Sequence, residues 1–157
     1  MEIASLEPIP PTSSIEVKEP AKELKLEKVS FSCGKDDNIP TTFGKIEGKE
    51  ELPMILWSSD FFTEAGYDPQ TRCQQVSARL ETYKKNDELS YLTTGEINGQ
   101  SVVCVTSKEQ GNCGEGISVH DGLLFTLKPN ENPQERLEQL FAVLQSKEQS
   151  QQKSLKE

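Results

Sequence analysis

Residues 89–106 read LSYLTTGEINGQSVVCVT, and they carry the strongest turn signal in the chain. The dipeptide Asn98-Gly99 suits a two-residue hairpin turn, because both central positions of such a turn need a positive φ. The runs on either side of it are rich in β-branched and apolar residues, which favour strands. We therefore expect an antiparallel hairpin that pairs Leu92 with Val105 on one face.

Further strands are predicted on both sides of this hairpin. The apolar residues either alternate with polar ones, as in a half-buried strand, or form short continuous runs, as in a buried one. Four segments have these patterns: Val29 to Cys33, Thr41 to Ile46, Pro53 to Trp57, and Gly122 to Leu127.

Two segments have the end signals and the period of helices. The first begins at Asp68-Pro69, an N-cap followed by a proline that needs no N–H partner, and ends near Lys84-Lys85-Asn86. The second begins at Asn132-Pro133. Apolar residues recur at helical spacing in both, at Cys73, Val76, Leu80 and Tyr83 and at Leu137, Leu140, Phe141 and Leu144. The predicted fold is α+β, an antiparallel sheet of about five or six strands with two helices packed on one face.

Composition divides the chain into three parts. We expect residues 1–28, rich in Pro and Glu, to form a disordered arm, residues 29–146 to form a single domain, and residues 147–157 to form a polar tail. The net charge of −9 argues against nucleic acid as a partner. No apolar run approaches the roughly 20 residues of a membrane span, although peripheral membrane association stays open.

Four cysteines, Cys33, Cys73, Cys104 and Cys113, indicate the compartment. Structural zinc sites usually draw ligands from close pairs, and these cysteines are widely spaced, so we expect two disulfides and an oxidising environment. Three connectivities are possible. We favour Cys33 with Cys104, strand to strand, and Cys73 with Cys113, helix to loop. No signal peptide is visible, so we expect a processed or trimmed chain, and a cytoplasmic protein with reduced cysteines is the alternative.

The other chemical motifs have ordinary structural explanations. His120-Asp121 follows Cys113 by seven residues and could form a nucleophilic pair with an acidic orienter, but a solvated loop is the favoured interpretation. The Gly-rich run 111–116 lacks phosphate-loop spacing and contains Glu115, which would repel phosphate. The sequence therefore predicts no catalytic, cofactor-binding or metal-binding residue.

An aromatic loop joins the third predicted strand to the first helix. We name as partner-binding candidates the side chains of Asp60, Phe61, Phe62, Glu64 and Tyr67. Aromatic rings surrounded by small and acidic residues are typical of a recognition patch. The alternative is that these rings fold down over the core, as most large rings do.

Five segments taken together resemble the circadian oscillating polypeptide domain of cyanobacteria: FSCG (31–34), RCQQVSARL (72–80), YLTTG (91–95), INGQSVVCV (97–105) and GLLFTLKP (122–129). The resemblance covers about residues 29–145, and the four cysteines fall at matching positions. It implies an exported or peripherally membrane-associated cyanobacterial protein, named for rhythmic abundance, with no enzyme activity, cofactor or catalytic residue. This chain departs from it in showing no signal peptide and in the longer stretch Gly114 to Asp121.

Two functional hypotheses follow. The first is a non-catalytic accessory or protein-binding domain of the cell envelope, periplasm or thylakoid lumen. The second is an enzyme or enzyme inhibitor that uses the loop from Cys113 to Asp121. The identity of the partner and the oligomeric state are left open by the sequence.

Overall fold

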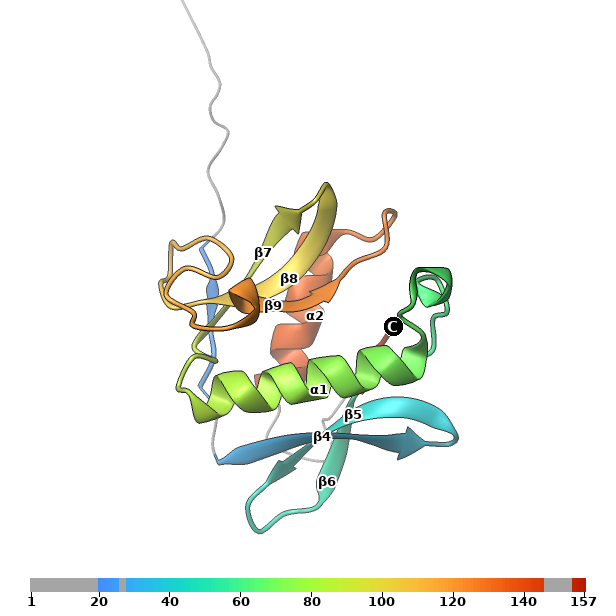
Figure 1. Cartoon of the computed structure of the whole chain (residues 1–157). Coiled ribbons are helices and arrows are strands. Elements are labelled where there is room, and N and C mark those ends of the chain that lie inside the picture. The colour runs from blue at the N-terminus through green and yellow to red at the C-terminus, as the bar shows by residue number, and fades with distance from the viewer. Residues whose placement is uncertain (1–19, 26–27, 146–153) are drawn as a thin grey trace, which may run out of the picture.

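The computed structural model describes residues 20–25, 28–145 and 154–157. Within these residues the fold is α+β, as the sequence predicts, with two helices, α1 (Pro69–Lys85) and α2 (Pro133–Gln145), and two four-stranded sheets. Figure 1 shows α1 running between the two sheets, with α2 behind the second sheet in this view.

The first sheet has the order β10-β6-β5-β4. Its strands β4 (Val29–Asp36), β5 (Ile39–Ile46) and β6 (Glu51–Leu56) form an antiparallel meander, and the short β10 (Leu155–Lys156) pairs with β6 in parallel. Helix α1 packs on β4 and β5.

The second sheet has the order β3-β7-β8-β9 and is antiparallel throughout. Its strands are β3 (Lys22–Glu23), β7 (Tyr91–Ile97), β8 (Gln100–Thr106) and β9 (Leu123–Thr126). Helix α2 packs on β7 and β8, whereas α1 contacts the edge strand β9.

The strands thus divide between two sheets, rather than joining in one sheet with both helices on one face. The reason lies in α1, whose buried residues Arg72, Cys73, Val76, Ser77, Leu80 and Tyr83 spread over more than a narrow stripe. One side of the helix covers the first sheet and another side meets the second, so α1 belongs to a core shared by both sheets.

The local signals in the sequence are confirmed in detail. Asn98 and Gly99 have φ values of 53° and 79°, and Leu92 pairs with Val105. The Asp68 carboxylate accepts a 2.8 Å hydrogen bond from the N–H of Thr71 at the start of α1. Side-chain and backbone conformation at these positions depend on near neighbours, which is why the sequence reveals them.

Two disulfides form, as predicted, but the favoured pairing is wrong. The bonds join Cys33 to Cys73 and Cys104 to Cys113, with Cα–Cα distances of 5.6 and 5.5 Å. Cys33 lies on β4, directly against α1, whereas Cys104 lies on β8 in the other sheet. The division into two sheets therefore separates Cys33 from Cys104. The loop after β8 brings Cys113 back beside β8, the strand that carries Cys104.

The domain also extends beyond residues 29–146. Ala21 and Leu24, in the expected arm, are buried beside β3, and Leu155, in the expected tail, is buried on β10. Two-residue strands are too short to show a period, so composition alone misplaces these boundaries. Residues 1–19 and 26–27 of the predicted arm and residues 147–153 of the predicted tail lie outside the described residues.

Candidate functional site

The aromatic loop between β6 and α1 carries two exposed rings. Phe61 is 54% exposed and Tyr67 is 47% exposed, and they are the exposed large hydrophobic residues of the described chain. Phe62 is 9% exposed and meets Phe61 edge to face, with the ring centroids 4.9 Å apart. Asp60 and Glu64 are exposed beside them. The loop thus combines an apolar tip with an acidic rim.

The inner ring of the loop is fixed by a buried arginine. The guanidinium of Arg72 lies 4.5 Å from the ring centre of Phe62 and 4.8 Å from that of Trp57, so it is stacked between them. It also donates a 2.8 Å hydrogen bond to the carbonyl of Thr126 on β9. Cation–π stacking of this kind anchors Phe62 and joins the loop to the second sheet.

The charge of Arg72 is matched by the buried carboxylate of Glu157, the residue that follows the last strand, β10. Arg72 Nη1 lies 3.6 Å from Glu157 Oε1, and Arg136 Nε lies 3.4 Å from Glu157 Oε2. Among the described residues, neither oxygen of this carboxylate has a hydrogen-bond partner. Burial, followed by repulsion from Glu131, raises the pKa of Glu157 to about 7, while both arginines oppose the rise. Burial also lowers the pKa of Arg72.

A row of polar side chains on α1 faces the edge strand β9. Arg72 bonds to the carbonyl of Thr126, Arg79 Nη1 donates to Leu124 O at 3.0 Å, and Tyr83 donates its hydroxyl proton to Leu123 O at 2.8 Å. Burial raises the pKa of Tyr83 to about 12, which keeps the phenol protonated as a donor. These bonds satisfy carbonyl groups that an unpaired sheet edge would otherwise expose.

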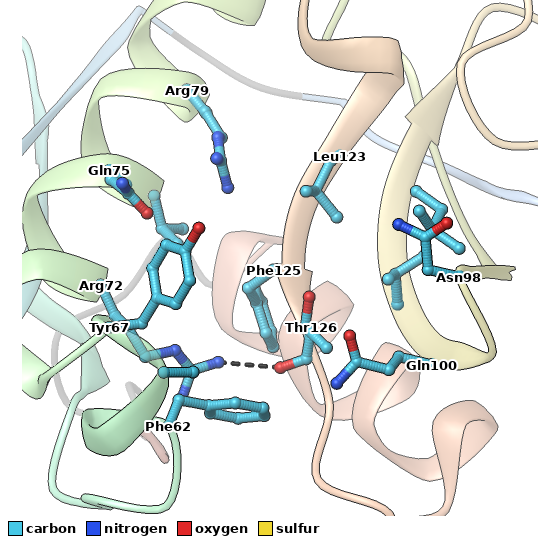
Figure 2. Close-up of a pocket in the computed structure, with 14 residues that line it drawn as sticks. Phe62, Tyr67, Arg72, Gln75, Arg79, Asn98, Gln100, Leu123, Phe125 and Thr126 are labelled. Atoms are coloured by element: carbon cyan, nitrogen blue, oxygen red, sulfur yellow. Dashed lines mark hydrogen bonds between the residues drawn. The ribbon is translucent and has the colours of Figure 1, made fainter.

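A groove of about 270 Å³ lies between α1 and the second sheet. Figure 2 shows Tyr67, Gln75 and Arg79 on one wall, with Leu123, Asn98 and Gln100 on the opposite side. Phe62 and Phe125 also line it. The groove therefore begins at the aromatic loop and runs along α1.

The structure brings only part of the predicted patch to this groove. Phe62 and Tyr67 line it, whereas Asp60, Phe61 and Glu64 stand outside the lining. Sequence reasoning missed Arg72 and Arg79. Their spacing of seven residues places both on one side of a helix, and this is the signal that could have found them.

The loop from Cys113 to Asp121 is the other candidate that the sequence names. Cys113 is bonded to Cys104, so its sulfur is not a thiolate. His120 and Asp121 are exposed, with positive φ values of 57° and 49°. The loop is held by hydrogen bonds such as that from the N–H of Ser118 to Glu88. Hydrogen bonding by Ser118, first from its side chain and then from its backbone, lowers the pKa of Glu88. These contacts make a fixed loop rather than a nucleophile beside a base.

In the part of the chain that the structure describes, no three His, Cys, Asp or Glu side chains are placed to hold a metal ion. None of the described helices is long and apolar enough to cross a membrane.

The family model of the circadian oscillating protein COP23 matches residues 30–157. The chain therefore belongs to this family, in agreement with the resemblance in five of its segments, and the match includes the short strand β10. Neither the curated proteins nor the solved structures contain a match to this chain.

Proposed function

We propose that this protein is a non-catalytic binding domain that recognises a partner protein through the aromatic loop. The observation that carries the proposal is the exposure of Phe61 and Tyr67, at 54% and 47%, on a loop whose base is fixed by Arg72 and Phe62. Exposed aromatic side chains on a preorganised surface are typical of binding hot spots, because they bury much area at little cost in conformational entropy.

The surroundings of the two rings suit a protein interface. Asp60 and Glu64 are exposed beside the rings, as the polar residues at the rim of an interface are. Main-chain hydrogen bonds fix the loop, from Thr63 to Asp60 at 3.0 Å and from Tyr67 to Phe62 at 3.0 Å. A partner would therefore meet a surface that needs little reorganisation.

The proposed compartment is oxidising. Disulfides persist in the cell envelope, the periplasm and comparable lumenal spaces, and they are rare in a reducing cytosol. Both disulfides of this chain have backbone separations suited to such bonds. For a member of this family we propose a cyanobacterial envelope, periplasm or thylakoid lumen, with the protein soluble or held peripherally at a membrane through its partner.

The test is site-specific cross-linking from the loop itself. The photoreactive residue p-benzoylphenylalanine replaces Phe61, and the full-length protein is irradiated in a native lysate of the source organism. We expect a discrete cross-linked product with one protein. The same residue in place of the exposed Lys35, on the first sheet, should give no such product.

A double variant then tests whether the rings contribute affinity. Phe61→Ala with Tyr67→Ala should abolish capture of the cross-linked protein while leaving the melting temperature nearly unchanged. Lys35→Ala with Asp36→Ala, two exposed residues at the end of β4, is the matched control. Undiminished capture by the aromatic variant would show that the binding surface lies elsewhere.

The alternative function is enzyme inhibition by the Cys113–Asp121 loop. One observation favours it, namely that the disulfide to Cys104 and the bond from Gly114 N to Val105 O fix one end of an exposed loop. In most protease–inhibitor complexes the interface backbone moves little on binding, which a loop fixed at one end would favour. Protease assays with the wild-type protein and with His120→Ala would separate the two hypotheses. Inhibition of a protease that is lost in His120→Ala would support the Cys113–Asp121 loop over the aromatic loop.

A further inference from the structure

The groove beside the aromatic loop has an unusual charge for this protein. The chain has 26 acidic residues and 17 Lys and Arg residues, and its net charge is −9. The groove lining nevertheless contains two arginines, Arg72 and Arg79, and no acidic side chain. An acidic protein thus presents a locally positive recess.

The two arginines of the groove differ in what they can still bind. Arg72 is 5% exposed, and Glu157 lies 3.6 Å from its Nη1 atom. Arg79 has no carboxylate within ion-pair distance in the described chain, and its guanidinium donates one hydrogen bond, to Leu124 O. A guanidinium has five N–H donors, so Arg79 keeps most of its capacity for an anionic group.

Apolar and amide side chains lie along the same groove. Phe62 and Tyr67 form its end at the aromatic loop, and Phe125 forms part of the floor (Figure 2). Gln75 on α1 and Gln100 on the opposite wall offer amide groups that can both donate and accept. The volume of about 270 Å³ is just below the range of roughly 300–1,000 Å³ typical of small-molecule sites. It suits a few side chains rather than a large cofactor.

The edge of β9 limits the way in which a peptide can bind. Strand addition needs free carbonyl groups at a sheet edge. On β9 the carbonyls of Leu124 and Thr126 already accept hydrogen bonds from Arg79 and Arg72. An extended ligand in this groove is therefore held through its side chains and not as an added strand.

We infer that the groove binds a short acidic segment of the partner protein, with a carboxylate on Arg79 and a neighbouring apolar side chain against Tyr67 and Phe62. This inference rests on the proposed function and specifies the chemistry of the partner. The aromatic loop supplies the apolar contact, and Arg79 supplies the selection for a negative charge, which the acidic surface elsewhere would repel.

The test compares two probes that differ in one charge. N-acetyl-L-phenylalanine has a ring and a carboxylate, and N-acetyl-L-phenylalaninamide has the same ring without the charge. Each is titrated into the full chain while the Arg79 Nε–Hε signal and the backbone amides of residues 62–79 are followed by NMR. We expect the acid to bind roughly tenfold more tightly, because a charge-assisted hydrogen bond is lost in the amide.

Two variants test whether Arg79 causes the preference for the acid over the amide. Arg79→Gln keeps an amide donor for Leu124 O but removes the charge, so it should bind the acid and the amide equally. Lys128→Gln, which removes the same charge outside the groove, should keep the preference. The inference is overturned if the wild-type protein binds both probes equally or neither, or if the acid shifts signals away from the groove. The comparison of the two probes on the wild-type protein tests the inference even if Arg79→Gln fails to fold.

Cross-linking from position 61 separates this inference from the proposed function. A cross-linked partner together with equal binding of the two probes would leave the proposed function standing and overturn the inference. Preference for the acid without any cross-linked protein would overturn both the partner and the proposed function, leaving only a carboxylate site.

Discussion

Phe61 and Phe62 are adjacent in sequence, yet their side chains lie in different environments. Phe61 is 54% exposed, whereas Phe62 is 9% exposed and stacks on Arg72. The core alternative therefore holds for Phe62, whereas Phe61 has the exposure that the proposed recognition patch needs. Any test of binding has to vary Phe61 and Tyr67 and leave Phe62 in place.

Single alanine substitutions of the two rings should differ in their effect on the free energy of unfolding. Phe62→Ala should lower the free energy of unfolding by about 3 kcal/mol, because it removes a buried ring and leaves a cavity. Phe61→Ala should change it by less than about 0.5 kcal/mol, as is usual at exposed positions. Urea denaturation of the two variants checks the prediction, and equal losses would contradict the assignment.

Because of Glu157, the stability of the fold should depend on pH. Its pKa is raised to about 7 in the fold, above the unperturbed value of about 4.3 for glutamate. A carboxyl group with a raised pKa stabilises the fold while protonated. That contribution is complete below about pH 4.3 and is lost as the pH rises through about 7.

Replacement of this carboxyl by an uncharged isostere should remove the dependence. We expect Glu157→Gln to gain stability relative to the wild-type protein as the pH is raised from about 5 to about 8, because glutamine stays neutral. Chemical denaturation at several pH values measures the difference between the two proteins. Parallel stability curves would mean that Glu157 keeps an ordinary pKa.

At the scale of elements, α1 has the widest role. It covers β4 and β5, carries Cys73 of one disulfide, and closes the edge of β9 through Arg72, Arg79 and Tyr83. Its sequence shows the apolar stripe clearly. The polar side chains beside the stripe face the second sheet because β9 lies next to them. No pattern within the helix sequence predicts the position of β9.

The hairpin of β7 and β8, unlike the position of α1, is determined by residues close together in the sequence. Gly99 has φ of 79°, and nothing lies within 4 Å of the position that a Cβ atom would occupy. Gly99→Val should therefore lower the free energy of unfolding by more than about 1 kcal/mol through backbone strain alone.

A matched variant separates strain from the mere addition of a side chain. Gly99→Asn should cost clearly less, because asparagine tolerates positive φ better than a β-branched residue does. Thermal unfolding of both variants is the measurement. Equal destabilisation would mean that the side chain, and not the backbone, is at fault.

At the scale of the whole molecule, the two disulfides hold different layers. Cys33–Cys73 joins β4 of the first sheet to α1 and spans 40 residues. Cys104–Cys113 spans 9 residues and fixes the loop after β8 within the second sheet. Neither bond joins the sheets directly, so their association depends on the shared apolar core around Trp57, Leu80 and Leu92.

Loop length predicts unequal contributions from the two bonds. The chain-entropy relation gives about 4 kcal/mol for Cys33–Cys73 and about 2.6 kcal/mol for Cys104–Cys113. Double replacement of each pair by alanine, followed by urea denaturation, should reproduce this order. A larger loss for the pair 104 and 113 would contradict it. Peptide mapping without reductant should also recover these two linkages and no others.

Much of the fold is predictable from the sequence. The six longer strands and both helices are found close to their observed bounds, and the caps at Asp68 and Asn132 are confirmed by bonds from Thr71 and Glu135. These features depend on residues a few positions apart. For the site, the sequence indicates the aromatic loop but not which ring is buried, nor that Arg79 faces the same groove.

By itself, then, the sequence determines the secondary structure, the α+β class, the presence of two disulfides and the family. Only the tertiary structure decides the pairing of the cysteines, the division into two sheets, the addition of β3 and β10, and the contact of Glu157 with Arg72. Those features join residues far apart in the chain. They depend on which surfaces α1 brings together, and periodicity and capping describe only the segment in which they occur.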